Sequence, residues 1–518
     1  MMTRIFKITI LALAVSFIQA CDSKLEITDP NRLSADAYYT TEGEAVAAVD
    51  AIYNTLIIDG LFQRVTPIYN DGRGDEALCR SPWTFMTGFS NFTLPASDAA
   101  GEIAWVGYYI MVSRANQAIE NIPNVPDLDD NLRNRLLGQA YFFRAFAHFQ
   151  LANFYGNPLI ITSTPKSQEE FYPSNEGVTK QMVYDQVQAD LEVAIPLLPG
   201  NYNGVSGPDL GQVGRITSGA ANALMGQLLL YQGLHSAAAP YFAAVINSNE
   251  YSLAPNYADI FSGVDALESS DPGRIFWAEF TESTNPDFNW GGDPLPTWRQ
   301  FTALAPTYSV ADFYDFRPTQ FLYDEMRQER TIDGNLDPRY HATILSYEPT
   351  EGYTTAYGDD WFARGFAATD FFIKKYTRAA TGGDAFTAGY NYPIIRYSDV
   401  LLMYAECLAN TGNISGAASH VQTVRDRANL PDREAEFAGY SLDQFMDQLA
   451  HERVCELALE GKRWYDIMRW GWLDNATKLA ELQANDAEFN TFVAERKVLP
   501  IPLTELDRNP NLVGTTAN

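Results

Sequence analysis

Two segments of the chain repeat the same spacing of small and apolar residues, and this repeat constrains the fold more than any other sequence feature. Each anchor of the second segment lies 179 residues after its counterpart in the first. The anchors are Gly226, Gly233, Ala238, Phe242 and Val245, then Ala405, Gly412, Ala417, Val421 and Val424. A small residue, a glycine turn, an alanine and two apolar residues at these intervals are typical of the paired antiparallel helices of tetratricopeptide repeats. The alternative is two unrelated helical hairpins that share ordinary small-residue packing.

Apolar periodicity predicts helices through most of the rest of the chain. Behind Thr40 and Thr41, which can cap a first turn, apolar residues at helical spacing run over 41–58. Leu137, Gly138 and Tyr141 resemble the first helix of another repeat, with its partner displaced to about 179–198. The remaining predicted helices cover about 98–121, 133–155, 216–232, 236–248, 393–411, 413–428, 441–460 and 462–472. We therefore expect a mainly α fold in which helix pairs over about 40–60, 98–250 and 393–472 form a scaffold.

The helical period fails in two stretches, about 61–97 and 250–392. Within the second, 275–280 and 371–376 read as short strands, and the rest is rich in Pro, Gly, Asp and aromatic residues. Irregular stretches of this length inside a compact protein usually carry function. We expect these two stretches to form the other half of a single domain covering 21–518.

Charge and motifs exclude several classes of function. With 36 Lys and Arg against 65 Asp and Glu, the formal net charge of −29 disfavours binding to nucleic acid. Four scattered cysteines and five histidines without metal-ligand spacing give no reason to expect a disulfide framework, a metal or another cofactor. Nucleophile-elbow, phosphate-loop and dinucleotide motifs are also absent, so nothing in the sequence proposes an enzyme, which stays a third hypothesis.

The amino terminus predicts a lipid anchor. Arg4 and Lys7 precede an uncharged stretch, 8–20, which is too short to span a bilayer and is typical of a secretory signal over 1–20. Ile18-Gln19-Ala20-Cys21 resembles a bacterial lipobox, in which the peptidase cuts before a cysteine whose sulfur is acylated. Cys21 is therefore the predicted lipidation site, and several acyl chains would make the attachment stable. An ordinary signal peptide with an accidental cysteine is the alternative.

The segment 452–471 is crowded with charged residues and could be mistaken for a catalytic cluster. Spacings of three and four place opposite charges on one helical face, so we interpret them as an ion-paired structural network. The residues are Glu452, Arg453, Glu456, Glu460, Arg463, Asp466 and Arg469.

Aromatic residues make up 13% of the chain, and several lie where no core periodicity demands a ring. Trp277 falls in an apolar strand pattern and is expected to be buried in the core or at an interface. Four other tryptophans lie in polar, Gly- and Pro-rich stretches, where rings beside Asp, Asn and Arg suit the faces and hydroxyl edges of sugars. The predicted ligand-binding residues are Arg73, Asp75, Trp83, Trp290, Trp298, Tyr353 and Trp361. For each ring, packing of its loop onto the scaffold is an equally good interpretation.

Several segments together resemble the SusD/RagB family of outer-membrane nutrient-binding lipoproteins. The similar segments cover nearly the whole chain after the lipobox, in the family's order, and include 44–56, 142–159, 184–199, 214–233, 394–413, 452–471 and 499–512. The resemblance implies four tetratricopeptide-like helix pairs, a loop-built site for an oligosaccharide or other nutrient, and no enzymatic activity. It also implies an outer-membrane location, facing outward, and a TonB-dependent transporter of the SusC type as partner.

No ligand residue is carried over from the family, because its ligand contacts vary in sequence. The predicted site residues therefore rest on side-chain chemistry alone. The alternative function is a scaffold at the outer membrane that binds peptide or protein ligands, since tetratricopeptide-like surfaces commonly do so.

Overall fold

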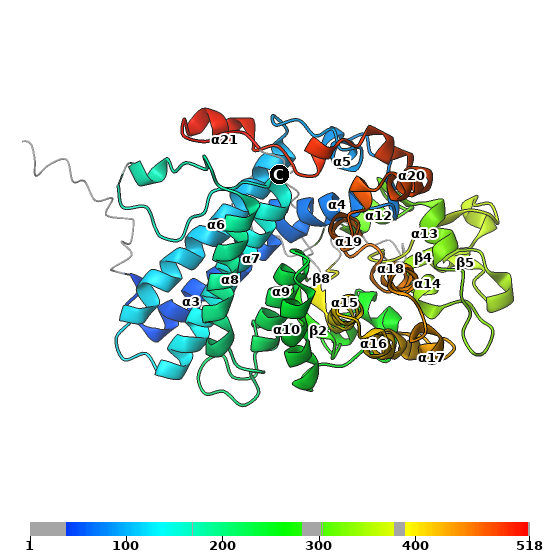
Figure 1. The fold of residues 1–518 in the computed structure, drawn as a ribbon, viewed down its shortest axis with the longest axis horizontal. Helices are drawn as coiled ribbons and strands as arrows, with labels where there is room; N and C mark the ends of the chain where they lie inside the picture. The colour runs from blue at the N-terminus through cyan, green and yellow to red at the C-terminus, as the bar shows by residue number, and fades with distance from the viewer. Residues whose placement is uncertain (1–37, 168, 282–301, 303, 378–388, 516–518) are drawn as a thin grey trace, which may run out of the picture.

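The computed structural model describes residues 38–167, 169–281, 302, 304–377 and 389–515. Successive long helices lie side by side across the molecule (Figure 1). Their bounds are α3 (Glu42–Tyr53), α6 (Ala99–Asn121), α7 (Asp130–Tyr155), α8 (Lys180–Leu197), α9 (Ser218–Leu230), α10 (His235–Asn247), α15 (Tyr397–Asn410), α16 (Ile414–Arg427) and α18 (Leu442–Leu457). Each packs against the next from α6 to α16, and the scaffold predicted from periodicity is confirmed.

Four antiparallel helix pairs make up this scaffold: α3 with α6, α7 with α8, α9 with α10, and α15 with α16. In the pair α9 and α10, a Cβ at Gly226 would lie 2.6 Å from the Phe242 ring, so only glycine allows this approach. The turn glycines Gly233 and Gly412 have φ of +71° and +87°, which a side chain would strain. The 179-residue repeat therefore reflects two equivalent helical hairpins.

Side-chain caps fix where the helices begin. The Thr41 hydroxyl accepts a hydrogen bond from the Glu44 N–H, which confirms the predicted cap of the first helix. Asp129 caps α7 in the same way, and Ser441 forms a capping box with Gln444 at the start of α18. These local signals account for the agreement between predicted and observed helix starts.

Short helices and strands make up the remainder. The helices are α4 (Val65–Gly72), α5 (Thr84–Ser90), α11 (Asp265–Glu268), α12 (Leu304–Tyr308), α13 (Gln320–Glu325), α14 (Pro338–Thr343), α17 (Glu434–Phe437), α19 (Arg463–Arg469), α20 (Ala476–Asn485) and α21 (Leu503–Arg508). The strands are β1 (Ala77–Cys79), β2 (Arg274–Ala278), β3 (Phe316–Pro318), β4 (Ile344–Ser346), β5 (Thr355–Ala356), β6 (Asp359–Asp360), β7 (Phe371–Ile373) and β8 (Tyr392–Arg396). The strands pair as four two-stranded antiparallel sheets, β1 with β3, β2 with β8, β4 with β7, and β5 with β6. Both predicted strands, β2 and β7, are present.

One stretch of the described chain, Glu42–Gln63, is long and apolar enough to cross a membrane by length and composition. Its mean hydropathy is 1.5, but 56% of it is buried inside the protein. It contains α3, whose apolar face packs on α6 and α7, so its hydrophobicity is that of a core helix.

Candidate ligand-binding site

The two irregular stretches of the sequence meet along one seam. Strands β1 and β3 pair in the register Ala77 with Pro318 and Cys79 with Phe316, although they are more than 230 residues apart. The pairing continues past β1, where the Arg80 N–H donates to the Asp315 carbonyl oxygen at 2.6 Å. This pairing brings part of the first irregular stretch against part of the second.

Trp83 lies at this seam, directly before α5, and 45% of its side chain is exposed. The Ser81 hydroxyl accepts a hydrogen bond from the Trp83 N–H at 3.1 Å and fixes the backbone there. The neighbouring Arg80 guanidinium is half exposed and pairs with Glu488 at 2.9 Å. Trp83 is thus an accessible ring beside charged hydrogen-bonding groups.

Strand β3 and the residues before it carry further polar and aromatic side chains along the seam. Arg317 is exposed, and its guanidinium lies 4.7 Å from the centre of the Tyr314 ring. Burial raises the pKa of Asp315, against the lowering effect of a hydrogen bond from Ser81. Sequence reasoning missed these residues because only the long-range pairing of β1 with β3 brings them to the segment that precedes Trp83.

Two predicted ligand residues, Arg73 and Asp75, are buried. Asp75 has no exposed surface, so the prediction that it faces a ligand is wrong. Arg73 lines a cavity of about 410 Å³ beside the C-terminal segment, and a ligand contact by Arg73 stays a prediction. The Arg73 guanidinium donates to the carbonyl oxygens of Arg496 and Lys497, at 2.7 and 3.2 Å, and so ties the C-terminal segment to α4. Asp75 accepts from Arg463 at 2.6 Å and from the Asn485 amide at 2.8 Å. The Asp75 charge is thus paired with a buried arginine, as a buried charge requires, whereas Arg73 is held by the Tyr69 hydroxyl and two backbone carbonyls.

Trp361 is also buried, with none of its surface exposed. Its indole N–H donates to the Ala367 carbonyl oxygen at 2.8 Å, and its ring packs on Phe366 and Phe372 in a small separate core. The ring holds its own loop together, so the packing interpretation is correct here and the ligand-contact prediction is wrong.

Tyr353 is 40% exposed and stacks on the His341 ring, with centroids 3.7 Å apart and planes at 15°. It lies between α14 and β5, in a part of the molecule separated from α5 and Trp83 (Figure 1). A ligand contact by Tyr353 therefore stays a prediction, independent of Trp83. Trp290, Trp298, the signal segment 1–20 and Cys21 lie outside the described residues.

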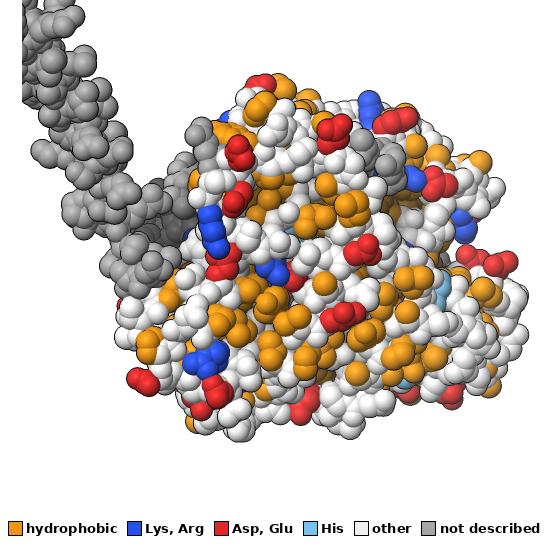
Figure 2. All heavy atoms as spheres, turned by 60° about the vertical axis from the view of Figure 1, so that its left-hand side comes forward, with side chains coloured by type: hydrophobic (Ala, Val, Ile, Leu, Met, Phe, Trp, Pro, Cys, Tyr) orange, Lys and Arg blue, Asp and Glu red, His pale blue; other side chains and the backbone are white. Residues whose placement is uncertain are grey.

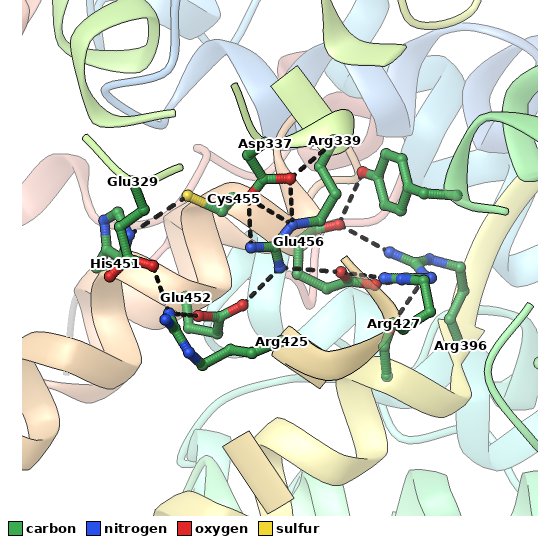
Figure 3. A network of polar contacts seen from close by, with 12 residues as sticks. Glu329, Asp337, Arg339, Arg396, Arg425, Arg427, His451, Glu452, Cys455 and Glu456 are labelled. Atoms are coloured by element: carbon green, nitrogen blue, oxygen red, sulfur yellow. Dashed lines mark hydrogen bonds and ion pairs between the residues drawn. The ribbon is translucent and has the colours of Figure 1, made fainter. Parts of the chain in front are cut away.

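The charged segment 452–471 is an ion-paired network, as predicted, but most partners come from other elements. Glu452 pairs with Arg339 at 2.5 Å and Arg425 at 3.2 Å, while Glu456 contacts Arg339, Arg396 and Arg427 (Figure 3). Although burial alone would raise the pKa of Glu456, these guanidinium groups hold it well below its ordinary value. The network joins α18 to α14, β8 and α16.

Buried carboxylates lie beneath the seam. Burial raises the pKa of Asp71 to about 6, and that of Glu76 to about 8, despite hydrogen bonds from the Gly461 and Leu459 N–H groups respectively. Both side chains are at most 2% exposed, so no substrate reaches them. Among the described residues, no group of three or more His, Cys, Asp or Glu could hold a metal ion.

Replacing Glu76 by Gln is expected to change how stability depends on pH. The folded protein keeps the proton of Glu76 up to about pH 8, whereas the unfolded chain loses it near 4.5. The wild type therefore loses stability as the pH rises through this window, by up to about 1.4 kcal/mol per pH unit. In urea unfolding at pH 5 and pH 8.5, the free energy of unfolding of Glu76→Gln should rise relative to that of the wild type only at pH 8.5. A stability difference of the same size at both pH values would show that Glu76 is ionised in the folded state.

The protein consists of stacked helix pairs, and loops on this stack form a surface of aromatic and polar side chains. These features are typical of helical-repeat proteins that serve as binding scaffolds. Two family models match the chain, one described as "SusD family" over 273–516 and one described as "Starch-binding associating with outer membrane" over 71–230. The chain belongs to the SusD family.

Relatives match along nearly their whole length. SusD-like protein P2 of Formosa agariphila is 25% identical, with 98% of both chains covered. The structure of a SusD superfamily protein from Bacteroides vulgatus superposes with a TM-score of 0.77 at 23% identity, covering 93% of this chain and all of that one. A laminarin-binding SusD-like protein superposes with a TM-score of 0.69 at 26% identity and the same coverage. The predicted family and the predicted fold are thus confirmed.

Proposed function

We propose that this protein is an outer-membrane lipoprotein that captures oligo- or polysaccharide on the surface around Trp83 and delivers it to a TonB-dependent SusC-like transporter. The single observation that carries the proposal is the exposed Trp83 ring at the seam of the two irregular stretches. The family description names starch binding and association with the outer membrane, and one structural relative is named for binding laminarin.

The chemistry of this surface suits a sugar. An indole face stacks on the aliphatic C–H groups of a pyranose ring, while the hydroxyl groups around the ring need donors and acceptors at its edge. Arg80 and Arg317 supply donors, and the exposed Glu and Asp side chains of an acidic protein supply acceptors. Figure 2 shows one face of the molecule, on which acidic and basic side chains are interspersed without a continuous basic patch.

A binding role without bond chemistry is consistent with the carboxylates described above. Four carboxyl groups of the described residues have a strongly raised pKa, and all four are enclosed by the protein and accept hydrogen bonds from backbone N–H groups: Asp71, Glu76, Glu268 and Asp486. General acid catalysis of glycoside cleavage needs such a group within reach of the sugar oxygen. Incubation with laminarin or starch should therefore yield no shorter chains.

Changing Trp83 to Ala is expected to weaken glycan binding by about tenfold or more, because the stacked ring supplies much of the contact area. Affinity gel electrophoresis against laminarin, soluble starch and other neutral polysaccharides measures the change. Phe171→Ala, which removes an exposed ring on a distant loop, is the matched control and should bind like the wild type. Undiminished binding by Trp83→Ala would remove the proposed site.

Anchoring and delivery are tested separately. A Cys21→Ser variant should lose membrane attachment and appear in the soluble fraction, whereas the wild type should copurify with a large outer-membrane transporter. Copurification with a soluble protein instead would favour a peptide-binding scaffold.

A further inference from the structure

A second groove lies on the opposite side of the loop-rich half, where the loop between α8 and α9 crosses β2. It consists of two adjoining cavities of about 140 and about 310 Å³, and the larger is at the lower end of the range for small-molecule sites. The segment Gln212–Arg215 and Trp277 line both cavities. Figure 1 shows β2 well separated from α5, so this groove is distinct from the surface around Trp83.

Trp277 is the central residue of the groove. In β2 the preceding Phe276 points into the core, where its ring contacts Phe142 and Phe146. The register with β8 shifts between Phe276 and Trp277, and Trp277 lines both cavities. The Trp277 side chain is only 6% exposed, and within the described part of the chain its indole Nε1 has no hydrogen-bond acceptor. A buried N–H without an acceptor costs free energy, and a ligand oxygen in the groove would supply the acceptor.

Both arginines that line the groove are paired. Arg215 donates to Asp50 at 2.8 Å, and Arg274 pairs with Glu279 while lying 5.2 Å from the Trp277 ring centre. The Glu250 carboxylate accepts a hydrogen bond from the Asn201 amide at 2.8 Å. An anionic ligand would therefore meet no unpaired positive charge here. An uncharged ligand rich in hydroxyl groups would meet an indole donor, three tyrosines, Tyr53, Tyr202 and Tyr251, and the amides of the rim.

The loop that crosses the groove is held close to β2. Gly214 has a φ of +96°, and a Cβ there would lie 2.7 Å from Glu279 Oε1, so this approach depends on glycine. The next side chain back, Val213, is 75% exposed and lines both cavities. A larger side chain at Val213 would therefore fill the groove without disturbing the core.

We propose that this groove is a second saccharide-binding site, specific for a neutral sugar unit whose oxygen accepts the Trp277 indole N–H. The inference takes its substrate class from the proposed function but concerns a different surface. Two separated sites on one chain would bind a long glycan more tightly than either site alone, since the second contact is intramolecular.

Selective ¹⁵N labelling of tryptophan side chains reports the two sites separately in one experiment. The indole signals of Trp83 and Trp277 are assigned with Trp83→Phe and Trp277→Phe, and the full mature chain is titrated with maltotriose and with laminaritriose. We expect a saturable shift of the Trp277 signal with at least one trisaccharide. Val213→Trp should abolish that shift and leave the response of Trp83 unchanged.

The matched control is Val193→Trp, at an exposed valine of α8 that lines neither cavity; it should leave both responses intact. A moving Trp83 signal with a static Trp277 signal would overturn the second site and leave the proposed function standing. A moving Trp277 signal with a static Trp83 signal would support the groove and count against the Trp83 surface. If neither signal moves with either sugar, both sites are wrong. A Trp277 shift that persists in Val213→Trp would also refute binding in the groove.

Discussion

Replacing Glu456 by Ala is expected to destabilise the protein by about 3–5 kcal/mol, which is a large share of the stability of a typical domain. The Glu456 carboxylate is fully buried and contacts Arg339 at 3.3 Å, Arg396 at 3.1 Å and Arg427. Removing this carboxylate leaves three positively charged guanidinium groups in a region from which water is excluded, with less negative charge nearby to compensate them. Urea unfolding monitored by tryptophan fluorescence measures the loss.

Glu436→Ala is the matched control for this prediction. Glu436 also pairs with an arginine, Arg433, at 2.6 Å, but its side chain is half exposed, so water replaces the lost partner. Glu456→Gln adds a second comparison, because it keeps the shape and removes only the charge. If Glu456→Ala unfolds at the same urea concentration as Glu436→Ala, the buried network does not stabilise the fold.

The same network shows which contacts of the fold can be predicted from the sequence and which cannot. Charges at spacings of three and four predict ion pairs along one helix, and Asp466 with Arg469 is such a pair. The partners of Glu452 and Glu456, however, come from Arg339, Arg396 and Arg425, which are 27 to 117 residues away. Local periodicity predicts helices and their pairing because it reflects neighbouring turns, but it contains no record of such distant contacts.

The candidate site shows the corresponding limit for function. Trp83 and Trp361 both lie in polar, irregular stretches of the sequence, yet Trp83 is 45% exposed and Trp361 is fully buried. The difference arises from Phe366 and Phe372, which enclose the Trp361 ring, and from the Ala367 carbonyl that accepts its N–H. The composition of a loop therefore does not predict whether its aromatic ring is exposed. That depends on which other rings pack around it, and these are known only from the structure.

For Trp277 the prediction is confirmed: its apolar strand pattern predicts burial in the core or at an interface, and the side chain is nearly enclosed. The pattern does not show that the loop Gln212–Arg215 leaves two cavities beside the Trp277 ring. These cavities are lined by residues that are far apart in the sequence. A buried indole can therefore still belong to a binding site. Its single N–H donor is satisfied by the protein when the ring is structural, and by the ligand when the ring belongs to a site.

Changing Gly60 to Ala is expected to destabilise the scaffold by about 3 kcal/mol or more, because the added methyl group meets backbone and not a movable side chain. A Cβ at Gly60 would overlap the carbonyl group of Ile103 and lie 2.8 Å from the Ala104 nitrogen, both in α6. Since α6 also packs on α3 and α7, it cannot move away without opening the first two helix pairs.

Gly43→Ala provides the control in the same part of the chain. A Cβ at Gly43, in the first turn of α3, would have nothing within 4 Å, so this change should leave the protein as stable as the wild type or slightly more so. Thermal unfolding of the two variants separates the effect of the methyl group from that of losing a glycine. Equal melting temperatures would mean that α6 does not approach Gly60 as closely as the structure shows, and the close packing of α6 on the segment Asp59–Gln63 would have to be rejected.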